Sequence, residues 1–173
     1  MDKDIIYLDN NSTTKVDERV IEVMIPFFTS NYGNSASRHS FGSLISQSVN
    51  KAREEVSELL NCHPNEIIFT SGATEAINLG IKGVLKSNSS KGKHVITVTT
   101  EHPAVLDTCR ALQSEGFEIT YLSVDKQGLI SIDDLKKYLR SDTVLVTVMH
   151  VNNETGTIQP IQEIAKATHE AGA

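Results

Sequence analysis

Cysteine is scarce in this sequence. The 173 residues include 2 cysteines, Cys62 and Cys109, and no Cys-x-x-Cys pair. This scarcity excludes a disulfide-stabilised scaffold and a cysteine-rich zinc module. Long apolar runs are missing as well, since none approaches the roughly 18–20 residues of a membrane span, and the chain opens without the apolar stretch of a secretory signal peptide. These absences predict a soluble protein of the cytoplasm.

Positive charge is also limited. The 16 Lys and Arg residues against 22 Asp and Glu give a formal net charge of −6, so neither nucleic acid nor an anionic membrane is an expected partner. No pair of histidines has metal-ligand spacing, and the Gly-rich patterns of dinucleotide and nucleoside triphosphate sites are absent. The hydrophobic fraction of 39% is nevertheless high enough for a packed core. We therefore expect a globular domain, or a piece of a larger one, without a metal site.

Apolar periodicity alternates along the chain between the helical and the strand types. Asp17 could cap a first helix, and further helices are predicted over 44–60, 74–86, 103–115, 131–139 and from 160 onward. Strands are predicted at 66–70, 94–99, 117–124 and 143–149. Such alternation is typical of a mostly parallel sheet with helices on both faces. The predicted fold class is α/β, with three layers.

The turn Ser71-Gly72-Ala73-Thr74 lies where a predicted strand meets a predicted helix. Unpaired amides and the positive end of the helix dipole form an anion site at such a place, and Thr74 can add a hydroxyl donor. Ligands also bind beyond the carboxyl ends of the strands in open parallel sheets. An ordinary turn capped by Thr explains the pattern about equally well.

Two further polar segments follow predicted strands. His102 stands just before Pro103 at a predicted helix start, where it could face a ligand, and Glu101 beside it could orient the imidazole. A solvent-facing loop histidine is the alternative. Asn152 and Asn153 follow the most apolar strand, and their amides need hydrogen-bond partners. A bound polar ligand or an Asn-rich turn would provide them.

Six segments in this order carry a resemblance to a known family. They are Tyr7-Leu8-Asp9-Asn10-Asn11-Ser12-Thr13-Thr14, Gly33-Asn34-Ser35-Ala36-Ser37-Arg38-His39, Phe69-Thr70-Ser71-Gly72-Ala73-Thr74-Glu75, Thr100-Glu101-His102, Val105-Leu106-Asp107-Thr108-Cys109 and Met149-His150-Val151-Asn152-Asn153-Glu154-Thr155-Gly156. Together they resemble the NifS/IscS-type cysteine desulfurases, which are pyridoxal 5′-phosphate (PLP) enzymes of the class V aminotransferase family and of fold type I. The resemblance runs through essentially the whole chain, with Ser12 and Ser35 departing from the usual Ala and Pro.

The resemblance implies a role for four residues. Ala73 and Thr74 match the pair that binds the cofactor phosphate, and His102 matches the histidine that stacks on the cofactor ring and helps with proton transfer. Asn153 matches the asparagine that hydrogen-bonds the phenolic oxygen of PLP. The implied reaction takes sulfur from L-cysteine, leaving L-alanine and an enzyme persulfide that supplies iron–sulfur cluster assembly or another sulfur-transfer pathway. The implied partners are sulfur-acceptor or scaffold proteins and a second copy of the chain in a homodimer.

The same resemblance predicts what the chain lacks. The Schiff-base Lys, the catalytic Cys and the Arg that binds the substrate carboxylate are expected beyond Ala173, so the chain alone is expected to be inactive. Residues 1–15 are expected to associate with the small domain, and 16–173 to form the N-terminal part of the PLP-binding large domain. The alternatives are a selenocysteine lyase or a class V aminotransferase on the same fold, and a non-catalytic binding or assembly module.

Overall fold

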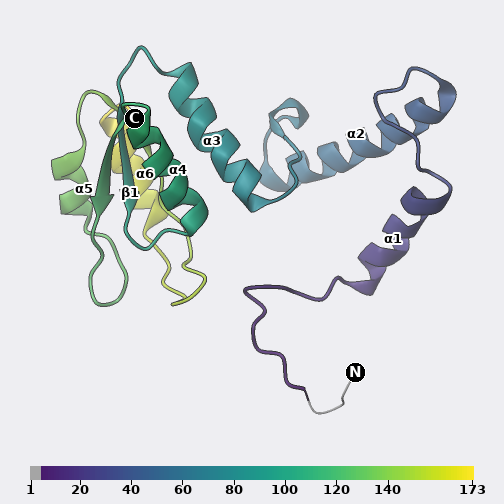
Figure 1. Cartoon of the computed structure of the whole chain (residues 1–173), viewed down its shortest axis with the longest axis horizontal. Helices are drawn as coiled ribbons and strands as arrows, with labels where there is room; N and C mark the ends of the chain where they lie inside the picture. The colour runs from purple at the N-terminus through teal and green to yellow at the C-terminus, as the bar shows by residue number, and fades with distance from the viewer. Residues whose placement is uncertain (1–4) are drawn as a thin grey trace. The chain divides into compact units, whose positions relative to one another are not determined.

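The computed structural model describes residues 5–173, which fall into two compact units that meet between Phe69 and Thr70 (Figure 1). Residues 1–4, part of the predicted N-terminal segment 1–15, lie outside the described residues. The predicted domain boundary after residue 15 stays a prediction. Among the described residues, no helix has the length and apolar character needed to cross a membrane.

The first unit is helical. Helix α1 (Glu18–Thr29) begins after Asp17, whose carboxylate accepts the Arg19 N–H at 2.9 Å, as the capping prediction requires. Helix α2 (Ser40–Leu60) is followed by a short 3₁₀ helix, η1 (Pro64–Glu66). Asn61 ends α2 in the left-handed conformation, which asparagine adopts more readily than most other residues.

The second unit contains a parallel sheet of three strands in the order β2-β1-β3. The central strand β1 (His94–Val98) pairs with β2 (Glu118–Leu122) on one side and with β3 (Thr143–Val146) on the other. The remaining elements of this unit are helices, namely α3 (Ala73–Ser87), α4 (Pro103–Ser114), α5 (Ile132–Tyr138) and α6 (Ile161–Glu170). The predicted helices and three of the four predicted strands are therefore present.

Alternation along β1 builds a core on each face of the sheet. Val95 packs with residues of α3 and α4, whereas Ile96 and Val98 pack with residues of α5 and α6 (Figure 1). Every residue of β1 is buried, as expected for a parallel strand covered on both faces. The three-layer α/β fold class predicted from the sequence is confirmed.

The predicted strand at 66–70 is wrong. Residues 67–70 have no regular structure, and the side chains of Ile68 and Phe69 are 67% and 50% exposed. A strand needs a neighbour that pairs with its backbone groups, and among residues 5–173 this segment is paired with no strand. Arg53 of α2 holds it instead, by donating to the Ile67 carbonyl and by placing its guanidinium 4.9 Å from the centre of the Phe69 ring.

A buried histidine joins the three strands at their amino ends. His94 is 1% exposed, and its Nδ1 lies 2.8 Å from Thr143 Oγ1 of β3. Its Nε2 lies 2.8 Å from Thr120 Oγ1 of β2. Burial lowers the pKa of His94 below its ordinary value of 6.5, and the charge of Arg140 acts in the same direction. His94 is thus a neutral structural side chain that links all three strands.

This histidine makes the stability of the sheet depend on pH. Below pH 6.5 the unfolded chain binds a proton at His94 that the folded chain resists, so the free energy of opening should fall as the pH drops through this range and stay level above it. Hydrogen exchange of the Val95 and Ile96 amides between about pH 5 and 8 measures this. His94→Gln should flatten the dependence, and an equal dependence in both proteins would contradict the assignment.

Candidate functional site

A cavity lies at the carboxyl ends of β1 and β3. Its volume is about 340 Å³, and two segments line it, 99–103 after β1 and 152–155 after β3. Because β1 and β3 run parallel, both segments leave the sheet at the same edge. Two of the predicted site residues, His102 and Asn153, therefore line one cavity although they are 51 positions apart in the sequence.

The imidazole of His102 is held by the start of α4. Its Nδ1 accepts the Ala104 N–H at 3.1 Å, which makes His102 the N-cap, and Pro103 fills the first helical position. An Nδ1 that accepts a hydrogen bond carries no proton, so the neutral ring has its proton on Nε2. The ring is exposed, which leaves Nε2 available to a ligand in the cavity.

Glu101 has a different place from the one that the sequence suggested. Its side chain is buried at 7% exposure, and Oε1 accepts the Met149 N–H at 2.5 Å. Burial raises the pKa of the carboxyl group, while hydrogen bonding by the backbone amides of Met149 and His102 acts in the opposite direction. The carboxyl group thus bonds to the backbone of the opposite segment, and orientation of the imidazole falls to the Ala104 amide.

Asn152 organises the segment after β3. Its Nδ2 donates to the Thr100 carbonyl at 3.1 Å, and its Oδ1 accepts the N–H groups of Glu154 and Thr155, both at 2.9 Å. The sequence indicated that the side-chain amide of Asn152 needs hydrogen-bond partners, but it did not indicate which groups these are. The signal was present, since an asparagine in a loop often closes a turn through its own side chain. The exposed Asn153 next to it lines the cavity.

The other two predicted residues, Ala73 and Thr74, lie in the first turn of α3. Both are exposed, and neither is among the residues that line the cavity. Gly72 before them has extended backbone and provides no side-chain cap, and a Cβ placed there would meet no atom within 4 Å. The first-turn amides of a helix have no partner inside the helix, so this end of α3 offers donors and open space to an anion.

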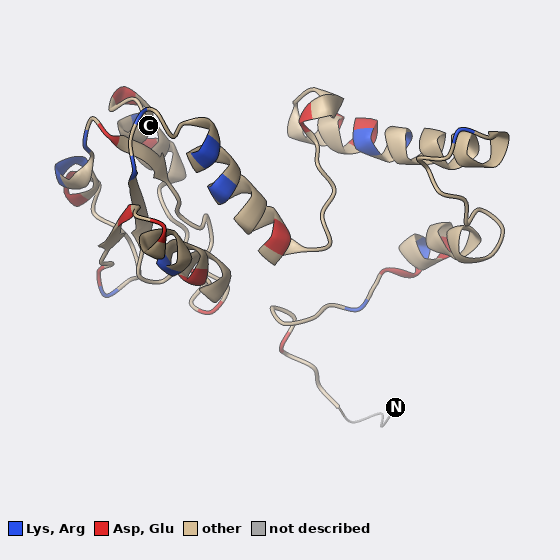
Figure 2. Cartoon of the chain, turned by 45° about the horizontal axis from the view of Figure 1, so that its top comes forward, with Lys and Arg blue, Asp and Glu red and all other residues tan. Residues whose placement is uncertain are grey.

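One carboxylate already lies at this turn. Glu75 accepts from the Ser71 amide at 2.7 Å and from Ser71 Oγ at 2.5 Å, and these bonds lower its pKa. Figure 2 shows acidic colour at the start of α3 and basic colour toward its end, the distribution that complements a helix dipole. Ser71 donates to Glu75, which leaves the Thr74 hydroxyl and the first-turn amides as the donors for an anion.

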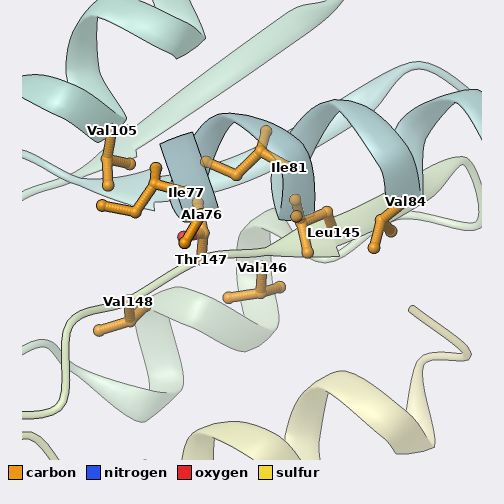
Figure 3. Close-up of a pocket in the computed structure, with 10 residues that line it drawn as sticks. Ala76, Ile77, Ile81, Val84, Val105, Leu145, Val146, Thr147 and Val148 are labelled. Atoms are coloured by element: carbon orange, nitrogen blue, oxygen red, sulfur yellow. The ribbon is translucent and has the colours of Figure 1, made fainter. Parts of the chain in front are cut away.

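A second hollow of about 360 Å³ lies between α3 and β3 but has no acid–base chemistry. Ile77, Ile81 and Val84 of α3 line it together with Leu145 of β3 (Figure 3). Thr147 is its one polar side chain and none of its lining residues ionises. This hollow is an apolar packing groove. The candidate site is the polar cavity that His102 and Asn153 line.

Comparisons with known proteins identify the family of this chain. A family model described as Aminotransferase class-V matches residues 6–173. The chain belongs to the aminotransferase class-V family. A protein of Methylococcus capsulatus named cysteine desulfurase IscS is similar to this class-V chain, with 54% identity over 168 residues, which make up 96% of the chain and 42% of that relative.

Two solved structures have the same fold as this class-V chain. One, described as a NifS-like protein, superimposes with a TM-score of 0.93 at 41% identity. The matched part makes up 96% of this chain and 46% of that protein. The other, described as SspA in complex with cysteine, has a TM-score of 0.89 at 38% identity over 95% of the chain and 47% of its own length. The chain thus spans less than half the length of these proteins.

The role of Asn152 in the site segment can be tested by truncation. In the full natural protein, Asn152→Ala removes the acceptor for two amides and the donor to Thr100, so the segment should open about 1–3 kcal/mol more easily. Hydrogen exchange of the Glu154 and Thr155 amides measures this opening. Asn88→Ala, which removes a donor to Val84 at 2.9 Å, is the matched control. Equal exchange in the two variants would contradict the role.

Proposed function

We propose that the full natural protein is a PLP-dependent cysteine desulfurase that converts L-cysteine to L-alanine and passes the sulfur on as a persulfide. The similarity to proteins of that name supports the activity, and the cysteine bound in a structure of the same fold supports the substrate. The single observation that carries the proposal is the meeting of His102 and Asn153 at one cavity, because the resemblance assigns both residues to the same cofactor ring.

The residues at the start of α3 fit the phosphate group of PLP. Thr74 would donate its hydroxyl, the first-turn amides from Ala73 onward would donate N–H groups, and the helix dipole would favour the negative charge. The open space at Gly72 leaves room for the oxygens. When bound, PLP supplies the electron sink that stabilises negative charge developing on the amino acid.

His102 and Asn153 would contact the ring of the cofactor. The Nε2 atom of His102 would hold or move a proton there, since its Nδ1 is occupied by the Ala104 amide. Asn153 would donate a hydrogen bond to the phenolic oxygen of the cofactor. The Schiff-base Lys, the catalytic Cys and the substrate-binding Arg are assigned to the part of the protein outside these 173 residues.

The proposal includes the setting of the enzyme. The protein would act in the cytoplasm as a homodimer and transfer its sulfur to acceptor or scaffold proteins, among them those that assemble iron–sulfur clusters. The sequence similarity to a desulfurase named IscS favours this location, oligomeric state and set of partners. Cys62 and Cys109 are not the sulfur carriers in this proposal. Burial raises the pKa of the Cys109 thiol to about 11, which keeps it protonated and unreactive at neutral pH.

The phosphate assignment predicts the effect of removing one hydroxyl. In the full natural protein, Thr74→Val deletes a donor to a charged group, worth roughly 1.5–3 kcal/mol, so the affinity for PLP should fall about ten-fold or more. Thr74→Ser keeps the hydroxyl and should retain most of the affinity. Titration of the apoprotein with PLP, followed by absorbance, measures both. Equal affinities for the valine and serine variants would refute the placement of the phosphate.

The assignment of His102 predicts a loss of turnover. His102→Ala in the full natural protein should lower the rate of sulfide release from L-cysteine by about 10²–10⁴-fold and shift the absorption band of the cofactor. His169→Ala, which changes an exposed histidine of α6, is the control and should leave both unchanged. Normal turnover with an unaltered spectrum in His102→Ala would make His102 a helix cap and nothing more.

A further inference from the structure

Hydrogen bonding between the site segments continues beyond the end of the β-ladder. The last backbone hydrogen bond between the chain after β3 and strand β1 runs from the Thr147 N–H to the Ile96 carbonyl at 2.9 Å. Beyond it, two side chains make the hydrogen bonds that join the segments. Glu101 accepts the Met149 N–H at 2.5 Å, and Asn152 donates to the Thr100 carbonyl at 3.1 Å. In both bonds the donor belongs to residues 149–152, after β3, and the acceptor to residues 100–101, after β1. Each bond joins a side chain of one stretch to the backbone of the other.

We propose that Glu101, together with Asn152, is a positioning residue that fixes His102 relative to Asn153. Glu101 directly precedes His102, and Asn152 directly precedes Asn153. Each crossing bond therefore anchors the backbone next to a cavity-lining residue to the opposite segment. This inference rests on the proposed function, in which His102 and Asn153 contact the same ring. A side chain misplaced by about 1 Å can cost 10²-fold in rate.

The chemistry of Glu101 suits this role. Its side chain is buried at 7% exposure, and no ion pair among residues 5–173 includes it. A buried carboxyl group without a cation is costly unless hydrogen bonds satisfy it, so its bond to the Met149 amide has to persist. Glutamine would keep an amide oxygen that can accept the Met149 N–H, whereas methionine has nearly the same length and only a weak sulfur acceptor. Glu101→Met therefore removes the acceptor at a similar side-chain volume.

Asn152→Asp provides a second, independent test. It keeps the oxygen that accepts the Glu154 and Thr155 amides but replaces the NH₂ group that donates to Thr100 by an oxygen, which repels the carbonyl. The turn is thus kept while the crossing bond is lost. Thr143→Val is the matched control, because it removes a buried partner of His94 at the opposite end of the same sheet.

The experiment is a double-mutant cycle in the PLP-loaded full natural protein, with kcat and KM for L-cysteine and the cofactor spectrum as readouts. We expect Glu101→Met and Asn152→Asp each to lower kcat by about 10–100-fold, with a smaller change in KM and a shifted cofactor band. In the His102→Ala background each should lower kcat by no more than about 2-fold, since residues that act through one another are not additive.

Two results would overturn the inference. One is an equal loss of kcat with and without His102. The other is a loss no larger than that of Thr143→Val at a matched decrease in melting temperature, which would make both residues structural only. If Glu101→Met does not fold, the cycle with Asn152→Asp decides alone. Normal turnover in the single variant His102→Ala would instead refute the proposed function, so the two failures are distinguishable.

Discussion

The parallel pairing of β1 with β3 is the constraint on which the candidate site depends. Every side chain of β1 is buried, so this strand cannot shift without exposing one of the two cores. The parallel direction then sends the chain out of both strands at the same edge. Thr99–Pro103 and Asn152–Thr155 meet there because the apolar residues of the strands pack, and their own polar side chains refine the arrangement.

The two ends of this sheet use histidine in opposite ways. At the amino ends, both ring nitrogens of His94 have hydroxyl partners and the ring is 1% exposed, so nothing is left for a ligand. At the carboxyl ends, His102 has one ring nitrogen engaged by the Ala104 amide and is otherwise exposed in a cavity. The number of satisfied nitrogens, together with burial, separates the structural histidine from the functional candidate.

Much of the second unit could be predicted from the sequence because its signals are local. Ser131 caps α5 through the Asp134 amide, and Gly116 ends the turn after α4 with a φ of +88°. The segment 67–70 has the same apolar character as β1, but whether it pairs depends on a neighbouring strand, which no local pattern encodes. The bond from Glu101 to Met149 spans 48 positions, so it too emerges only with the fold.

The start of α3 differs from the cavity in how it can hold charge. Glu75 is exposed, so solvent screens its repulsion toward a phosphate, and its bonds to Ser71 fix the turn that precedes the helix. The donors offered to an anion there are mostly backbone amides, which do not titrate. At the cavity, the groups that the proposed function uses are the side chains of His102 and Asn153. The proposed function therefore places the binding of the phosphate at the start of α3 and the transfer of protons at the start of α4.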